Sequence, residues 1–200
     1  MSRRSYATHG IDRYPAKMIP RLARYAIERV SKRGETILDP FCGCGTVMVE
    51  SLLLGRNSIG FDINPIAVTL TRAKASFYDV RRFRGLVDAV VSEAFNTYTE
   101  IAPVDRWLDY WFTAGTLRKL IQLRTVIESR RQTKHYELLR AALIISVRKC
   151  SKADPRSPKP FISKRARRCR VGKHFDAHEI FLNTANSLAD ASEDLFAHCT

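Results

Sequence analysis

A glycine-rich segment constrains this chain more than any other feature. It reads Asp39-Pro40-Phe41-Cys42-Gly43-Cys44-Gly45-Thr46 and follows the short, β-prone run 36–38. Gly43 and Gly45 let the backbone turn sharply and approach a ligand without a Cβ in the way. The apolar spacing over 46–54 then predicts a helix, which Gly55 ends. The segment therefore predicts a strand, a tight turn and a helix whose free N–H groups face a ligand crevice.

A second strand and an acidic residue repeat this arrangement. Residues 58–61 predict a strand that ends in Asp62, and Pro65 suits the first turn of another helix. The order strand, helix, strand, helix implies a parallel sheet. A carboxylate at the end of the second strand could accept both hydroxyl hydrogens of a ribose, as in dinucleotide folds. The alternative is that Asp62 only caps the next helix after a tight turn.

The sequence changes character after about residue 80. A helix is expected between Arg13 and Gly34, but the strand-like runs stop after the second strand. Helical patterns then cover 83–97, 113–130 and 134–150, followed by a loop over 151–173 and a final helix over 177–196. We therefore expect an α/β fold with an incomplete sheet over 1–80 and a helix-rich region over 81–200.

Composition limits the binding partners and the cellular compartment that we expect for this chain. The net charge is +14 in 200 residues, which favours a polyanionic partner such as nucleic acid. No apolar run is long enough to cross a membrane, and the N-terminus lacks the pattern of a secretory signal. The five cysteines are irregularly spaced, and the Cys42-Gly-Cys44 pair lacks the spacing of a zinc site. We expect a cytoplasmic protein with reduced thiols, no metal and no membrane partner.

These motifs resemble those of S-adenosylmethionine-dependent DNA amino-methyltransferases, which methylate an exocyclic amine of adenine or cytosine. Residues 39–46 look like the glycine-rich motif of that family, and residues 60–65 look like its acidic ribose-binding motif. Residues 8–20 are similar to the segment that lies against the methionine end of the cofactor. Looser similarity covers 109–112 and 147–155. The family implies a Rossmann-like methyltransferase sheet, of which this chain would hold only part.

The resemblance also implies which residues bind S-adenosylmethionine. Asp39 would bind the amino group of the methionine part, Lys17 would lie near its carboxylate, and Asp62 would hold the ribose with Ile63 against the adenine. A solvated surface lysine is the alternative for Lys17. The complete expected set is Pro15, Ala16, Lys17, Asp39, Pro40, Phe41, Gly43, Cys44, Gly45, Thr46, Asp62, Ile63 and Asn64.

The catalytic motif of that family is missing. Its members carry Asp, Asn or Ser, then Pro-Pro and an aromatic residue, which together bind the target base after it leaves the duplex. This sequence has no Pro-Pro pair, and it has no Pro-Cys pair of the kind used for attack on a cytosine carbon. We therefore assign no catalytic residue. The chain would be one subunit of a split enzyme or a truncated piece, and a second polypeptide would supply the tetrapeptide and cover the first strand.

A basic segment predicts contact with DNA. It contains one acid, Asp154, and nine basic residues: Lys152, Arg156, Lys159, Lys164, Arg165, Arg167, Arg168, Arg170 and Lys173. We take the first eight as candidate DNA contacts. The alternative is a solvated loop, and ordering only on DNA is a further possibility.

Two other functions remain open. RNA guanine methyltransferases share a similar glycine-rich motif, although they usually carry an added RNA-binding domain that we do not find here. The chain could also be a non-catalytic cofactor-sensing or DNA-binding module. The leading interpretation is a subunit of a split DNA methyltransferase, of the kind found in restriction-modification systems.

Overall fold

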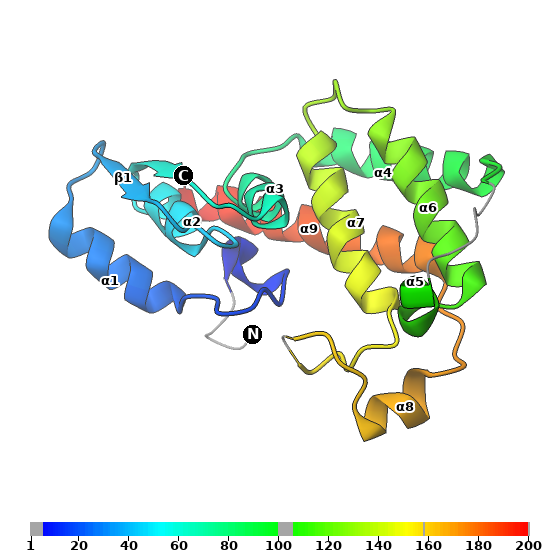
Figure 1. Ribbon diagram of the computed structural model, residues 1–200. Helices are drawn as coiled ribbons and strands as arrows, with labels where there is room; N and C mark the ends of the chain where they lie inside the picture. Colours follow the sequence, from blue (N-terminus) through cyan, green and yellow to red (C-terminus); the bar gives the residue numbers. More distant parts are fainter. Residues whose placement is uncertain (1–5, 100–105, 158, 200) are drawn as a thin grey trace. The chain divides into compact units, whose positions relative to one another are not determined.

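The computed structural model describes residues 6–99, 106–157 and 159–199 of the chain (Figure 1). Their elements, in chain order, are the 3-10 helix η1 (Ala7–Gly10), α1 (Pro20–Val30), β1 (Thr36–Asp39), α2 (Thr46–Leu53), β2 (Asn57–Gly60), α3 (Pro65–Lys74), α4 (Val80–Asn96), α5 (Arg106–Trp111), α6 (Ala114–Glu128), α7 (Tyr136–Cys150), α8 (Lys164–Arg170) and α9 (Ala177–Cys199). No helix among the described residues is long and apolar enough to cross a membrane.

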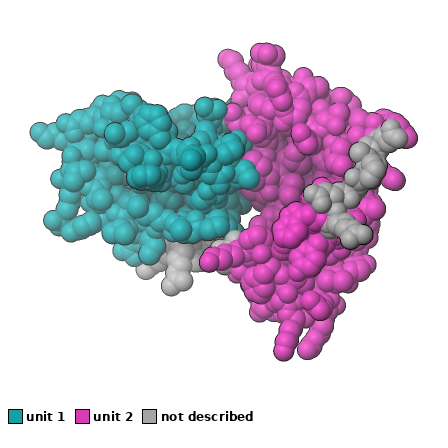
Figure 2. All heavy atoms as spheres, viewed as in Figure 1, with its two compact units in different colours: residues 1–80, 187–200 teal, residues 81–186 magenta. Residues whose placement is uncertain are grey.

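The chain forms two compact units, coloured separately in Figure 2. Residues 1–80 and 187–200 make up the first unit, and residues 81–186 make up the second. The long helix α9 therefore contributes its first turns to the second unit and its last turns to the first.

The first unit contains a small parallel sheet. Strands β1 and β2 pair in parallel with Leu38 opposite Ile59 and Asp39 opposite Gly60. Helix α2 makes the crossover between the strands and packs on both, and α1 packs against α2. A partial α/β fold with a parallel sheet and a helical remainder is thereby confirmed.

One face of this sheet carries apolar side chains that the described residues leave largely exposed. The paired residues Leu38 and Ile59 point to the same face and are 62% and 50% exposed. By contrast, Val49 of α2 is fully buried in an apolar cluster with Ala7 and Leu195 of α9. The core of the first unit therefore lies on the α2 side, and the opposite face exposes apolar strand side chains.

The second unit is helical throughout its described residues. Helices α6 and α7 pack against each other, and the fully buried side chains Phe83, Leu123, Leu138 and Phe181 come from four different helices. The helical patterns over 83–97, 113–130 and 134–150 correspond to α4, α6 and α7.

The prediction of a continuous loop over 151–173 is wrong. Helix α8 lies within it and begins after Ser163, whose hydroxyl oxygen accepts a hydrogen bond from the amide of Ala166 at 3.0 Å. A serine before a helix is a standard N-cap, but the three prolines upstream and the cationic sequence hid it. The short helix α5 was also not predicted, because its six residues are too few to show a period.

Candidate functional site

Two glycines shape the turn between β1 and α2. Gly43 and Gly45 adopt φ angles of +51° and +83°, a region that favours glycine. A Cβ on Gly45 would lie 2.9 Å from the Thr71 hydroxyl oxygen, so the turn also packs tightly against α3. The same hydroxyl donates a hydrogen bond to the carbonyl of Gly43 at 2.9 Å. Thr71 of α3 therefore fixes the conformation of this turn.

Asp62 connects this turn to the end of β2. Its Oδ2 accepts a hydrogen bond from the amide of Gly43 at 2.9 Å, and its Oδ1 accepts one from the amide of Asn64 at 2.8 Å. Asn64, rather than Asp62, caps α3, because its side-chain oxygen accepts from the amide of Ile66. Each carboxylate oxygen of Asp62 has a second lone pair, so the group can accept further hydrogen bonds from a ligand.

Asp39 lies at the end of the neighbouring strand, opposite Gly60 in the sheet register. One of its oxygens accepts a hydrogen bond from the amide of Phe41 at 3.0 Å. The side chains that follow the two acids are exposed, with Phe41 at 86% and Ile63 at 101%. Two carboxylates and two exposed apolar side chains thus lie at the carboxyl ends of adjacent parallel strands, where ligands bind in open α/β sheets.

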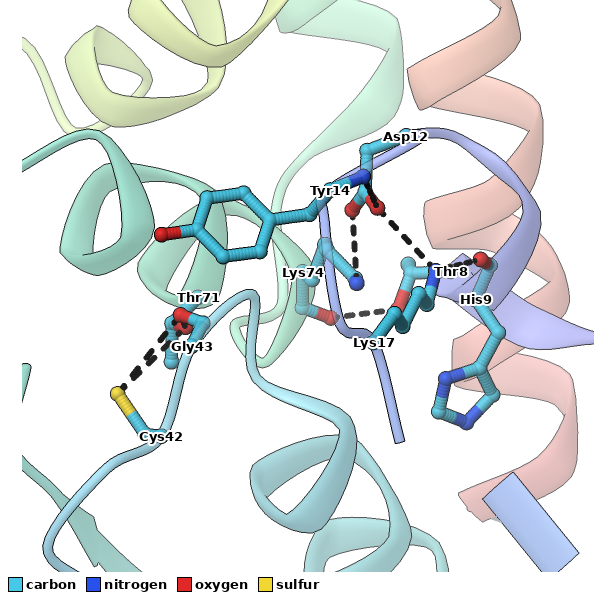
Figure 3. Close-up of polar contacts among 9 residues, drawn as sticks. All are labelled: Thr8, His9, Asp12, Tyr14, Lys17, Cys42, Gly43, Thr71 and Lys74. Carbon is cyan, nitrogen blue, oxygen red and sulfur yellow. Dashed lines mark hydrogen bonds and ion pairs between the residues drawn. The ribbon is translucent and has the colours of Figure 1, made fainter. Parts of the chain in front are cut away.

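Residues 8–20, here called the approach segment, pass over the glycine-rich turn. The Tyr14 ring carbon Cε1 is 3.9 Å from the position of a Cβ on Gly43, and Figure 3 shows the ring over the turn. The Tyr14 hydroxyl accepts a hydrogen bond from the side-chain amide of Asn64 at 2.9 Å. Tyr14, from residues 8–20, therefore lies against the glycine-rich turn and against Asn64, the residue that follows Ile63 after the end of β2.

A buried lysine holds this approach segment. The Lys74 ammonium pairs with Asp12 at 2.8 Å, and the two side chains are 0% and 4% exposed. Lys17 pairs with the other oxygen of Asp12 at 3.2 Å and donates a hydrogen bond to the carbonyl of His9 (Figure 3). Burial alone would raise the pKa of Asp12, but the two ammonium groups lower it. Burial and the nearby Lys74 also lower the pKa of Lys17. This cluster of two cations and one carboxylate has one excess positive charge.

A second buried carboxylate holds the start of the segment. Glu50 of α2 has no side-chain exposure and accepts hydrogen bonds from Tyr6, His9 and Arg24. Burial alone would raise the pKa of Glu50, but these donors lower it below its ordinary value. The ionised carboxylate of Glu50 thus connects α2 to the start of the chain and, through Arg24, to α1.

The two cysteines of the turn are buried thiols. Burial raises the pKa of Cys42 and of Cys44, so both remain protonated at neutral pH. Among the residues described by the structure, no group of three or more His, Cys, Asp or Glu side chains could hold a metal ion.

In the basic segment of the second unit, the single acid, Asp154, connects other residues of that segment. Asp154 is buried and accepts hydrogen bonds from Ser163 and from the backbone and side chain of Arg156. These donors lower the pKa of Asp154. Arg170 of α8 donates from Nε to the carbonyl of Ser151 at 3.0 Å and also bonds the carbonyl of Lys149. Arg156 and Arg170 therefore hold α8 in place.

The remaining cations of α8 face solvent. Lys164, Arg165, Arg167 and Arg168 are exposed, and none of their side chains has a hydrogen bond or ion pair to another residue of the described chain. Lys159 is exposed as well, whereas Lys152 donates from Nζ to the carbonyl of Asp109 at 2.7 Å. Of the eight predicted DNA contacts, Lys152, Arg156 and Arg170 have internal partners, although the Arg156 side chain is also 63% exposed.

Three structural residues of the site escaped sequence reasoning. Asp12, Thr71 and Lys74 fix the approach segment and the turn, but sequence reasoning assigned no role to any of them. Asp12 lies within residues 8–20, which the resemblance had selected as a whole. Thr71 and Lys74 lie in α3, where the sequence showed only an ordinary helical pattern.

Comparisons with known proteins agree with this geometry. Residues 1–73 match the model of the N6/N4 methyltransferase family, described as DNA methylase. The chain is 37% identical over 84 residues to the type II methyltransferase M.MjaII of Methanocaldococcus jannaschii, covering 42% of the chain and 16% of that relative. It is 31% identical over 133 residues to the type II methyltransferase M.MvaI of Kocuria varians, covering 60% of the chain and 29% of that relative.

An RNA-modifying enzyme also shows similarity. The tRNA (guanine(10)-N2)-dimethyltransferase of Methanothermobacter thermautotrophicus is 39% identical over 71 residues, covering 35% of the chain and 21% of that relative. No solved structure matches the chain. The chain thus spans less than a third of each of these relatives, and the family similarity lies in the segment that builds the glycine-rich turn and both acids.

Proposed function

We propose that this chain is the S-adenosylmethionine-binding subunit of a split DNA amino-methyltransferase. With a partner polypeptide, it would methylate the exocyclic amine of adenine or cytosine in DNA. The arrangement of Asp39, the glycine-rich turn and Asp62 carries the proposal. Two acids at adjacent strand ends, with an open backbone turn between them, suit a nucleoside cofactor that has hydroxyl donors and an ammonium group.

The residues of the site fit the cofactor chemically. Asp62 would hold the ribose hydroxyls, because its oxygens keep free lone pairs beside the bonds to Gly43 and Asn64. Asp39 would bind the amino group of the methionine part. The exposed Ile63 would lie against the adenine.

The remaining contacts follow from the turn and the approach segment. The excess positive charge around Lys17 suits the carboxylate of the methionine part, since Asp12 balances only one of two ammonium groups. The other proposed contacts are Pro15, Ala16, Pro40, Phe41, Gly43, Cys44, Gly45, Thr46 and Asn64. When bound, the cofactor supplies a methyl group on a sulfonium centre, and this chain would position that group without a catalytic residue of its own.

We place the partner polypeptide at the uncovered side of the sheet. Among the described residues, β1 pairs only with β2, so its other edge has unpaired backbone groups. Leu38 and Ile59 beside that edge are largely exposed. A strand from a partner that carries the Asp/Asn/Ser-Pro-Pro-aromatic tetrapeptide would pair with this edge and cover these side chains.

The exposed cations of the second unit support DNA as the substrate. Lys159, Lys164, Arg165, Arg167 and Arg168 form a cationic surface, and Asp154, the acid of this segment, is buried and hydrogen-bonded to Arg156 and Ser163. Such a surface suits phosphate contacts. We include Lys152, Arg156 and Arg170 in the DNA-contacting segment, where they would act chiefly by holding its shape.

The RNA guanine methyltransferase alternative rests on the tRNA relatives, which match shorter parts of the chain. The similarity to M.MvaI covers 60% of the chain, which is more than the first compact unit contains. This extension favours DNA over RNA. A non-catalytic cofactor-sensing or DNA-binding module would share every contact named above and differs only in lacking methyl transfer.

Reconstitution tests the proposal. The tagged chain would be purified from its native host, and co-purifying polypeptides would be identified by mass spectrometry. We expect a stoichiometric partner with the tetrapeptide, and methyl transfer to duplex DNA only when both purified chains are present. Transfer to tRNA instead would support the RNA alternative. Cofactor binding without transfer in the presence of the purified partner would support the non-catalytic module.

A further inference from the structure

Helix α5 exposes a cluster of aromatic rings. The rings of Trp107 and Tyr110 are stacked, with centroids 6.2 Å apart and planes at 15°. Trp111 meets Tyr110 edge-on at 4.8 Å and Trp107 edge-on at 6.2 Å. Trp107 is 66% exposed and Tyr110 is 49% exposed. Large aromatic groups of this kind are usually buried, so an exposed, mutually supported cluster indicates a binding surface.

Hydrogen bonds join this cluster to the basic segment. The amide of Lys152 donates to the carbonyl of Trp111 at 2.8 Å, and its ammonium donates to the carbonyl of Asp109 at 2.7 Å. One residue earlier, the carbonyl of Ser151 accepts from Arg170 of α8. Ser151 and Lys152, which directly follow α7, are therefore hydrogen-bonded to the last residues of both α8 and α5.

A cationic hollow lies on α8 itself. It has a volume of about 300 Å³ and is lined by Ile162, Lys164, Arg167 and Arg168. No acid lines it, and these three cations are among the exposed side chains described above. The hollow can take a negatively charged group such as a phosphodiester, with one apolar wall.

We propose that α5 and α8 form a surface for unpaired nucleotides. The rings of Trp107 and Tyr110 would stack on unpaired bases, and Lys164, Arg167 and Arg168 would bind the phosphates that join them. This inference rests on the nucleic-acid contact in the proposed function, and it goes further by specifying strands with accessible bases. A protein partner would explain exposed aromatic side chains, but it would leave the hollow on α8, with its three cations, without a role.

The chain contains a built-in probe for this surface. Its only two tryptophans are Trp107 and Trp111, so the intrinsic tryptophan fluorescence reports on the α5 cluster alone. We would titrate the purified chain with three oligonucleotides of about a dozen nucleotides. They are a single strand, an abasic strand of equal length and charge, and a duplex. We expect quenching by the single strand and much weaker quenching by the abasic strand and the duplex.

Variants separate stacking from charge. Trp107→Ala combined with Tyr110→Ala should weaken single-strand binding by roughly five- to a hundredfold, the range expected for one stacked base, with little effect on the abasic strand. Trp107→Phe should retain most of the affinity. Arg167→Ala with Arg168→Ala should weaken binding of all three probes. Tyr98→Ala removes a 90% exposed aromatic side chain elsewhere in the second unit and serves as the matched control.

Equal affinities for the abasic and intact single strands would overturn the inference, as would an unchanged affinity of the Trp107→Ala/Tyr110→Ala variant. Either result, with duplex binding preserved, leaves the proposed DNA contact standing. No binding of any of the three probes by the unmodified chain would contradict both the inference and the proposed DNA contact. Cofactor binding, measured separately, should be the same in every variant, because all these substitutions lie in the second unit.

Discussion

The carboxylate of Asp62 holds the backbone of Gly43, with Oδ2 2.9 Å from the amide nitrogen across 19 residues of sequence. The end of β2 thereby fixes the turn that follows β1. One side chain thus links the two motifs that sequence reasoning treated separately. Substitution of Asp62 should therefore reduce both the stability of the turn and the affinity for the cofactor.

We expect Asp62→Asn to weaken S-adenosylmethionine binding by roughly tenfold or more. The amide keeps one acceptor but places N–H groups where an oxygen accepted from Gly43 or would accept from a ribose hydroxyl. Isothermal titration calorimetry measures the Kd, and a thermal melt checks the fold. Glu28→Gln, which removes an exposed carboxylate from α1, is the control. An unchanged Kd would contradict the ribose role.

Gly45→Ala should destabilise the chain more than Gly34→Ala. Both residues have φ near +85°, at +83° and +87°, so both variants carry the same backbone cost of about 1 kcal/mol. A Cβ on Gly34 meets nothing within 4 Å, whereas one on Gly45 meets Thr71 at 2.9 Å. The difference between the two free energies of unfolding in urea isolates this contact. Equal losses would show that the turn can move away from α3.

Asp12→Asn should cost roughly 3–5 kcal/mol, because it leaves the Lys74 ammonium buried without its partner carboxylate. Lys74→Met in the same chain should recover much of that loss, since the fully buried ammonium is then gone and only Lys17, whose side chain is 19% exposed, has lost its carboxylate partner. Urea unfolding of the two single variants and the double variant gives the coupling energy. Additive losses would mean that the two side chains do not interact.

The stability of the chain should fall as the pH drops below about 6.5, the ordinary value for histidine. Burial and the nearby Lys119 lower the pKa of His178, with Asp176 opposing them, so the unfolded chain takes up the proton first. The contribution is complete above the unfolded pKa and is lost as the pH falls towards the folded value. His9 acts with the same sign, because burial lowers its pKa too. His178→Leu should flatten the slope of unfolding free energy against pH, and an unchanged slope would contradict this role of His178.

Removing the exposed cations of α8 should lower the affinity for duplex DNA at every sequence. A Lys164→Ala/Arg167→Ala/Arg168→Ala variant should also reduce the slope of log K against log salt by about 0.9 for each phosphate that the protein no longer neutralises. Fluorescence anisotropy over a salt series measures both quantities. The charge-matched control replaces three exposed cations of α6 and the following loop: Arg118, Arg124 and Lys134. Equal effects of both triple variants would indicate attraction by net charge alone.

The sequence predicted the first unit well where local chemistry decides the structure. Glycines, prolines and acids at the strand ends mark β1, α2, β2 and the start of α3, because each has a strong conformational preference. It could not reveal the buried pair of Asp12 and Lys74, since the two residues lie 62 positions apart and a buried lysine looks like a surface one in sequence. Helices α5 and α8 were missed because a helix of six or seven residues completes less than two turns.

The buried pair of Lys74 and Asp12 also restricts how this sequence can diverge. A lineage that loses only one member of the pair leaves the other charge stranded in the interior and must pass through a poorly folded intermediate. We therefore expect relatives to keep both residues or to have exchanged both for uncharged ones. The pair should behave as a single inherited character, although its members lie in separate segments of the gene.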